Sequence, residues 1–364
     1  GLGELGRTDE IAPAADIGHS VADASAEASH LRHPLGYQQT QGYRLAGALA
    51  QADAVIAQMR CNTLDVTFED SWHSALVGLS AMSRGALDDS RRALHESLAS
   101  LGPDGSGRML KSFSQSWLTA VTAMTGRGAD ARQQFDAIEW WAKDPDACSF
   151  DSDRSLAEAW TCAAEGSVSQ AISIVRAAAA RESVLGRPAW EVLLLQTAAQ
   201  FGDATAAPRL AELAEHVQGP RAPAAAMHAA ALAAGDGDGL LESSDTYQEF
   251  GDRFAAADAA AQAAVAYRNA GRRGSALVAA ATAQRLAASC GGADTPALGG
   301  ATMPVPVTAR QREVISLAVQ GLSNKQIATR LALSVRSVEG HLFRASKRVG
   351  ANSREQLIGM LRGA

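Results

Sequence analysis

The sequence predicts an all-α protein in which a long superhelix of paired helices precedes a small domain of four short helices. Three observations predict this fold. Apolar residues recur at helical spacing from about Leu35 to Ser289, with almost no alternating β-branched runs typical of strands. A glycine recurs at intervals of 36 to 41 residues in that region. Further along the chain, three Ser/Thr-x-x-Gln sequences mark helix starts.

The composition is that of a globular chain without a membrane span. Of its 364 residues, 47% are hydrophobic and 20% are charged, which suffices for the cores of two or more domains. No apolar run reaches the roughly 18 residues of a transmembrane helix. The four cysteines are scattered, without metal-ligand spacing. We therefore expect no membrane partner, no metal or other cofactor, and a cytoplasmic location with reduced thiols.

The charge is divided unevenly along the chain. Residues 307–364 hold ten Lys/Arg and three Asp/Glu, a balance of +7, whereas the other 306 residues hold 23 basic and 36 acidic side chains, a balance of -13. An acidic body with a basic C-terminal part predicts a polyanionic partner for that part alone.

Residues 35–289 are divided by glycines, each followed five positions later by a small residue. The pairs are Gly47/Ala52, Gly85/Ser90, Gly126/Ala131, Gly166/Ala171, Gly202/Ala207 and Gly274/Ala279, and Gly235–Gly239 supplies the unit missing from the series. The glycine permits a tight turn, and the small residue lets two helices approach closely. The units resemble tetratricopeptide repeats, although they are longer than the usual length of about 34 residues, and stacking them would form a concave face. An irregular alanine-rich bundle is the alternative.

Two segments outside these units are expected to be less regular. Residues 1–34 are predicted to be irregular or partly disordered. Residues 290–306, "CGGADTPALGGATMPVP", contain four glycines and three prolines and show no helical periodicity. They are predicted to form a helix-free tether between the body and the basic domain.

Tryptophans in the middle repeats are candidates for binding an effector. They are Trp117, Trp140, Trp141, Trp160 and Trp190. On a concave face such rings could stack on a saccharide or hold a peptide. The alternative is that most of them are packing residues of the core. Trp140 and Trp141 are adjacent, so a helix would direct them about 100° apart and only one could be fully inward.

Four short helices are predicted within residues 307–364. Capping pairs Thr308/Gln311, Ser323/Gln326 and Ser353/Gln356 start helices at about 309–320, 324–331 and 354–361, and Ser334 starts another at about 335–349. Gly321 and Gly350 end the first and third helices. The second and third helices, joined by a short turn, predict a helix-turn-helix.

The third of these helices has two different faces. Val335, Val338, Leu342, Ala345 and Val349 recur at helical spacing and are predicted to face the core. Arg336, Gly340, Phe343 and Lys347 form the opposite face, with Glu339 and Arg344 at its edges. A face with basic residues at both ends and little bulk between them suits insertion into a DNA major groove.

Residues 307–361 resemble the LuxR-type helix-turn-helix domain over its full length. The matching motifs are "TARQREV" (308–314), "GLSNKQIA" (321–328), "SVEGHL" (337–342) and "KRVGANSR" (347–354). The resemblance implies that Glu339, Gly340 and Phe343 face the bases. It implies contacts near phosphates for Asn324, Lys325, Ser337, Arg344, Lys347 and Arg354. It also implies a homodimer on double-stranded DNA, with Leu357, Ile358 and Leu361 at the contact.

Two positions depart from many members of this family. Glu339 stands where a lysine or asparagine is common, and Gly340 stands where the side chain is usually larger. A glutamate can accept from cytosine but repels phosphates. A glycine costs about 1 kcal/mol of helix propensity relative to alanine. The target sequence is therefore not readable from these residues.

The whole chain resembles the C-terminal part of a large ATP-dependent LuxR regulator of the maltose-activator type. Such regulators carry a G-x-x-x-x-G-K-[ST] motif, which is absent here. With the first residue not a methionine, this predicts a fragment of such a regulator. The resemblance implies a saccharide effector; the alternative is a scaffold that binds a partner protein or peptide. No HExxH or G-x-S-x-G motif is present, so the sequence does not indicate an enzyme.

Overall fold

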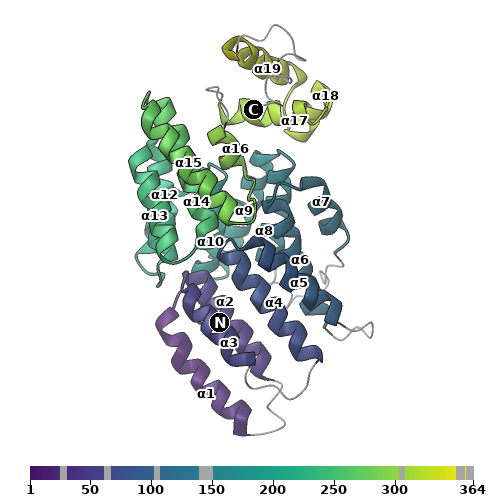
Figure 1. Cartoon of the computed structure of the whole chain (residues 1–364), viewed down its shortest axis with the longest axis vertical. Helices are drawn as coiled ribbons and strands as arrows, with labels where there is room; N and C mark the ends of the chain where they lie inside the picture. The colour runs from purple at the N-terminus through teal and green to yellow at the C-terminus, as the bar shows by residue number, and fades with distance from the viewer. Residues whose placement is uncertain are drawn as a thin grey trace.

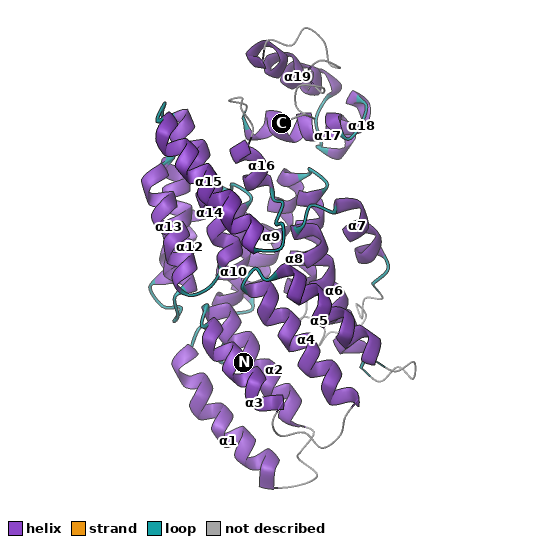
Figure 2. Cartoon of the chain, viewed as in Figure 1, coloured by secondary structure: helices purple, strands orange, loops and turns teal. Residues whose placement is uncertain are grey.

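The structure of the chain is a computed structural model that describes residues 1–24, 31–60, 67–101, 107–138, 151–302, 308–349 and 357. Within these residues the regular elements are helices, and no strand is drawn (Figure 2). The helices stack side by side into a long body, and a group of three lies beyond one end of it (Figure 1). The predicted all-α architecture is confirmed. Among the described residues no helix has the length and apolar character needed to cross a membrane.

The body is built from helices that pack against their neighbours along the chain. Its first half comprises η1 (Thr8–Glu10), α1 (Ile11–Ala24), α2 (Arg32–Ala46), α3 (Leu49–Arg60), α4 (Thr67–Ser83), α5 (Leu87–Ser100), α6 (Arg108–Met124) and α7 (Gly128–Asp136). Its second half comprises α8 (Asp151–Ala164), α9 (Val168–Val184), α10 (Pro188–Gln200), η4 (Ala204–Ala206), α11 (Ala207–Ala214), α12 (Arg221–Ala234), α13 (Gly237–Glu249), α14 (Arg253–Asn269), α15 (Arg273–Ser289) and α16 (Pro296–Thr302).

Most of the predicted turn glycines lie between helices, as expected. Gly47, Gly85, Gly126, Gly166, Gly202 and Gly235 have φ angles between 63° and 95°. Gly274 is an exception because it lies inside α15. The turn before α15 is made by Gly271, whose φ is 75°. The chain offers two glycines three residues apart, and the one beside the end of α14 takes the left-handed conformation, so the prediction of Gly274 is wrong.

Ser90 shows why a small residue follows the turn glycine. It is fully buried between α4 and α5, where its hydroxyl donates to the carbonyl of Gly78 at 2.7 Å. A Cβ at Gly78 would lie 2.6 Å from Cγ of Leu94, so the two helices pack with no space for a larger residue. The close approach expected from the sequence is therefore present in this pair.

The N-terminal segment is more regular than expected. Residues 11–24 form α1, which buries Ile11, Ala15 and Ala22. The segment before α1 is attached to the body, since the carbonyl of Glu4 accepts from the amide of Ala189 at 3.1 Å. The expectation of an irregular segment is wrong for these residues because α1 finds apolar partners on α2. The part of that prediction that covers residues 25–30 lies outside the described residues.

The predicted tether is part of the body. Asp294 donates its backbone amide to the carbonyl of Met124 at 2.9 Å, and residues 296–302 form α16. Thr295 caps this helix by accepting from the amide of Leu298 at 3.2 Å, and Pro296 follows as its first residue. The Thr-Pro pair is a helix-start signal that outweighs the later glycines. The expectation of a helix-free tether is therefore wrong for residues 290–302, and residues 303–306 lie outside the described part.

Among the buried titratable groups in the second half of the body, Asp258 and His228 have strongly shifted pKa values. The carboxyl of Asp258 accepts from Gln200 at 3.0 Å and from the hydroxyl of Thr295. Burial raises its pKa to about 7, although these hydrogen bonds oppose the shift. His228 contacts Oε1 of Gln262 at 2.6 Å, and burial lowers its pKa to about 4. Both groups are therefore mainly uncharged just below neutral pH.

Candidate nucleic-acid interface

The three C-terminal helices have the bounds that the capping signals predict. They are α17 (Ala309–Val319), α18 (Asn324–Arg330) and α19 (Val335–Val349). Thr308 and Ser323 each form a complete capping box, in which hydroxyl and glutamine side chain satisfy the first amides of α17 and α18. Because these contacts span three residues, the sequence determines the helix starts locally.

The turn between α18 and α19 contains an unusual backbone conformation. Ala332 has a φ of 51°, in the left-handed region that costs a residue with a Cβ roughly 1 kcal/mol or more. Ser334 then starts α19 by accepting from the amide of Ser337 at 3.0 Å. The turn thus sets the angle between the two helices at some cost in strain.

The inner face of α19 packs into the core of the small domain. Val338, Leu342 and Ala345 are buried there, as predicted. Val335 is 41% exposed, so its assignment to the core is wrong. It lies at the first position of the helix, before the turn in which the chain enters the core. The side chain of Val349 lies outside the described residues.

The outer face of α19 is exposed. Arg336, Glu339, Phe343, Arg344 and Lys347 are all exposed, and the Phe343 ring is 63% accessible. The ammonium of Lys347 lies 5.7 Å from the centroid of this ring. A Cβ at Gly340 would meet only the Arg344 guanidinium, at 3.7 Å or more. Packing therefore does not require a glycine at position 340, and the face presents basic groups around one aromatic ring.

The other residues predicted near phosphates lie on α18 and at the start of α19. Lys325 is exposed, whereas Asn324 and Ser337 are half-buried. All three lie in the first turn of their helix, where backbone amides also face outward. Arg354 lies outside the described residues. The structure thus brings the described members of the predicted set to α18 and α19.

The predicted dimer contact is only partly described. Leu357 is 1% exposed and belongs to the core of the small domain, together with residues such as Val314 and Leu317. Its assignment to a dimer contact is therefore corrected, since its own domain already covers the side chain. Ile358 and Leu361 lie outside the described residues.

The predicted effector-binding tryptophans are core residues where they are described. Trp117 is stacked on Phe113 with ring centroids 5.5 Å apart, and Trp160 packs edge-on against Phe201 at 4.6 Å. Trp190 is buried as well. A cavity beside Trp117 and Trp160 measures about 60 Å³, too small for a saccharide. The assignment of these three to ligand stacking is corrected, and Trp140 and Trp141 lie outside the described residues.

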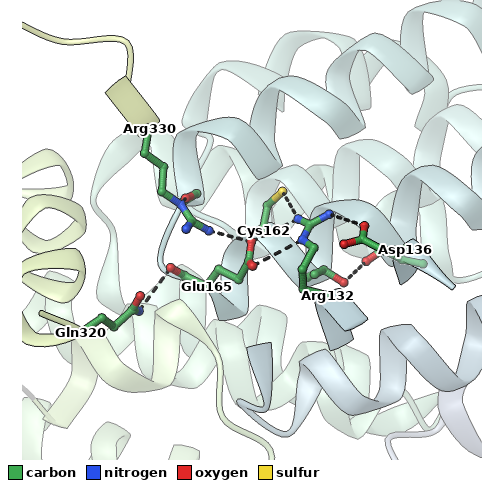
Figure 3. A network of polar contacts seen from close by, with 9 residues as sticks. Arg132, Asp136, Cys162, Glu165, Gln320 and Arg330 are labelled. Carbon is green, nitrogen blue, oxygen red and sulfur yellow. Dashed lines mark hydrogen bonds and ion pairs between the residues drawn. The ribbon is translucent and has the colours of Figure 1, made fainter. Parts of the chain in front are cut away.

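The small domain docks on the turn between α8 and α9. Arg330 donates to Oε2 of Glu165 at 2.6 Å and to the hydroxyl of Ser167, also at 2.6 Å. The side chain of Gln320 donates to the backbone carbonyl of Glu165 at 3.2 Å. From the body side, Arg132 donates to the same carboxylate at 3.1 Å (Figure 3). Glu165 therefore joins a helix of the body to a helix of the small domain.

A second set of contacts caps α9 from the small domain. The carboxylate of Glu313 on α17 accepts from the backbone amide of Ser169 at 2.8 Å and from its hydroxyl at 2.7 Å. Arg310 donates to that hydroxyl at 2.6 Å and forms an ion pair with Glu313. A carboxylate at a helix N-terminus is favourable, because the first amides lack partners within their own helix. The start of α9 thus depends on α17 for this partner.

Docking leaves the outer face of α19 accessible, because the contacts come from α17 and from the end of α18. Sequence reasoning did not identify Glu165, Ser169, Glu313 or Arg330 as a group. Their contacts join residues more than 140 positions apart, and no short motif indicates such a pairing.

Comparison with known proteins bears on this domain alone. The family model "Bacterial regulatory proteins, luxR family" matches residues 305–361. Spore germination protein GerE from Bacillus subtilis is 36% identical over 52 residues, which are 14% of this chain and 70% of GerE. The chain belongs to the luxR family of bacterial regulatory proteins.

A second relative is Response regulator Rre1 from Synechocystis sp., which is 43% identical over 61 residues. The match covers 16% of this chain and about a quarter, 26%, of that relative. No solved structure is significantly similar to the chain. The luxR assignment thus rests on the C-terminal domain.

Proposed function

We propose that the chain is a sequence-specific regulator of transcription that binds double-stranded DNA through α19. The observation that supports this best is the exposed face of α19, in a helix-turn-helix whose family is established. Its exposed ring at Phe343 and its exposed basic groups at Arg336 and Lys347 are side chains suited to contact bases and phosphates in the major groove. The proposed role is that of a regulator and not of an enzyme.

The charge distribution supports a DNA partner. The balance of +7 in residues 307–364 is separate from the acidic body, so the field attracts a polyanion to one end of the molecule. Phosphate contacts release counterions, so the affinity should fall steeply as salt concentration rises. A homodimer on two half-sites remains part of the proposal. Ile358 and Leu361 are its candidate contacts, without Leu357.

The test is an electrophoretic mobility assay with the full chain and promoter fragments from its own locus. Arg336→Ala should weaken binding and lower the salt slope by about one unit, as for one lost phosphate contact. Arg285→Ala on α15 is the matched control, since Arg285 is exposed on the body. Binding that is absent for every fragment, or equal loss in both variants, would refute the proposal.

The body is proposed as the input of this regulator. Its docking to α17 and α18 is a physical connection through which an effector could alter the small domain. The saccharide prediction and the maltose-activator architecture stay predictions. The burial of Trp117, Trp160 and Trp190 removes three of the five rings on which the saccharide prediction depended. Partner-protein binding by the body stays the alternative.

A further inference from the structure

A cavity of about 600 Å³ lies where the small domain meets the body. Its walls come from the α8–α9 turn, the end of α10, α14, α16 and α17. Because α17 belongs to the small domain, the cavity exists only in the docked arrangement. Its volume falls within the range of about 300–1,000 Å³ that is typical of small-molecule sites.

Most of the cavity wall is apolar. The larger side chains are those of Ile172, Phe201, Leu232, Leu240 and Val265, with Ala266 and Ala297 between them. These surfaces favour a ligand with an apolar skeleton, since burying apolar area is the main non-directional contribution to binding.

Most charged and amide groups that line the cavity already have partners. Gln200 donates to Asp258, Gln262 donates to backbone carbonyls of α10, and Gln320 donates to the carbonyl of Glu165. Arg310 and Glu313 form an ion pair. These groups therefore shape the wall but are not the free anchors of a ligand.

Arg312 is different, because its guanidinium has no ion pair or hydrogen-bond partner among the described residues, and its Nε is fully covered. It lies against α16, where a Cβ at Gly300 would be 3.1 Å from Nη1. Burial, and next the charge of Arg268, lower the pKa of Arg312. Arg268 itself donates to the carbonyls of Gly300 and Ala301, and no carboxylate of the described residues pairs with it. The Arg312 guanidinium thus lines the cavity without a counter-ion among the described residues, and Arg268 is near enough to lower its pKa further.

We infer that the cavity binds a small organic acid, with its carboxylate or phosphate group on Arg312 and its apolar skeleton against Phe201 and Leu232. The planar guanidinium donates well to either anionic group. The contacts of Arg312 favour neither a carboxylate nor a phosphate, so the experiment includes one ligand with each group. This inference goes beyond the proposed function, since the ligand can bind whether or not the chain binds DNA.

Asp294 should make the cavity select ligands that carry a single anionic group. Its carboxyl lines the same cavity, has no side-chain partner among the described residues, and lies beside the turn of Gly126, where the residue is exposed. Partial desolvation raises the pKa of Asp294, but a second anionic group placed near it would still be opposed. A monoacid should therefore bind better than a diacid of the same length.

The ligand should also hold the small domain on the body. Ligand contacts with α17 exist only when the domain is docked, so binding shifts the population toward that state. The amide of Ser169 reports this directly, because its partner is the carboxylate of Glu313. Its hydrogen exchange should slow when the cavity is filled.

The experiment titrates the full chain, without DNA, with octanoate, octyl phosphate, octanedioate and 1-octanol, by calorimetry and thermal shift. Octanoate or octyl phosphate should bind, and Arg312→Gln should weaken binding about tenfold or more. Arg285→Gln is the matched control. Ala266→Phe should abolish binding by filling the cavity, which gives a second variant if Arg312→Gln is poorly folded.

Binding of octyl phosphate alone, or of octanoate alone, would support the inference and identify the headgroup. Equal binding of 1-octanol or of octanedioate, undiminished binding by Arg312→Gln, or no binding by any probe would overturn it. Arg336→Ala should lose DNA and keep the acid, whereas Arg312→Gln should lose the acid and keep DNA. Failure of this inference is therefore distinguishable from failure of the DNA-binding proposal.

Discussion

The substitution Glu165→Gln should release the small domain from the body. Glu165 is 16% exposed in its side chain and Arg330 is 31% exposed, so their 2.6 Å ion pair is intermediate between surface and buried pairs. Exposed pairs contribute about 0.2–1 kcal/mol, and breaking buried ones costs about 3–5 kcal/mol. We take about 1.5 kcal/mol for this pair, which corresponds to roughly a tenfold larger undocked population.

The assay is hydrogen exchange at single-residue resolution. The amide of Ser169 lies in the first turn of α9 and donates to Glu313 of the small domain at 2.8 Å, so undocking removes its acceptor. Glu165→Gln should therefore lower the protection of Ser169 about tenfold. Amides in the middle of α9 should not change, since their acceptors belong to α9 itself.

Arg176→Gln is the matched control. Arg176 lies on α9, the same helix as the reporter amide of Ser169, and it forms an ion pair with Asp203 at 3.0 Å. This ion pair does not involve the small domain. Unchanged protection of Ser169 in Glu165→Gln, or an equal loss in Arg176→Gln, would refute the docking energetics. The double variant with Arg330→Gln should show a coupling of the same size as the pair itself.

The remaining predictions concern strain, recognition and pH. Ala332→Gly should raise the free energy of unfolding by up to about 1 kcal/mol, because it relieves a positive φ, and a lower melting temperature would contradict this. Lys347→Ala should weaken binding to all DNA sequences alike, whereas Phe343→Ala should mainly alter discrimination between them. Identical losses in competition assays would contradict the assignment of Lys347 to phosphates and of Phe343 to bases. The pKa of Asp258 is raised to about 7, so its contribution to stability is present below pH 4 and is lost as pH rises to 7. The pKa of His228 is lowered to about 4, so its contribution is present above pH 6.5 and is lost as pH falls to 4. The two oppose each other in thermal melts between pH 4 and 6.5, and Asp258→Asn should make stability fall with acid there; an unchanged pH profile would disprove the shift.

Local signals in the sequence determined the helix-turn-helix. Thr308 and Ser323 cap helices through atoms three residues away, and the observed helices begin where these signals place them. Turn glycines such as Gly85 act in the same local way, because a left-handed residue ends a helix whatever surrounds it. Where two glycines compete, as at Gly271 and Gly274, only the packing of α14 and α15 selects one.

Burial was decided by the tertiary structure. A tryptophan such as Trp117 has the same sequence pattern whether it lines a groove or fills a core, and only the neighbouring helices distinguish the two. The same holds for Leu357, which is apolar at a helical position and is covered by its own domain. The segments predicted to lack regular structure form α1 and α16, because α2 and α14 provide apolar partners for them.

The sequence by itself determined the helix periods, the caps and the division of charge, since each depends on residues that are near in the chain. Only the tertiary structure decided that Glu313 caps α9, that Glu165 pairs with Arg330, and that Arg312 lines a cavity with no counter-ion among the described residues. These contacts join distant segments, and their energies depend on distance and burial, which no residue pattern encodes.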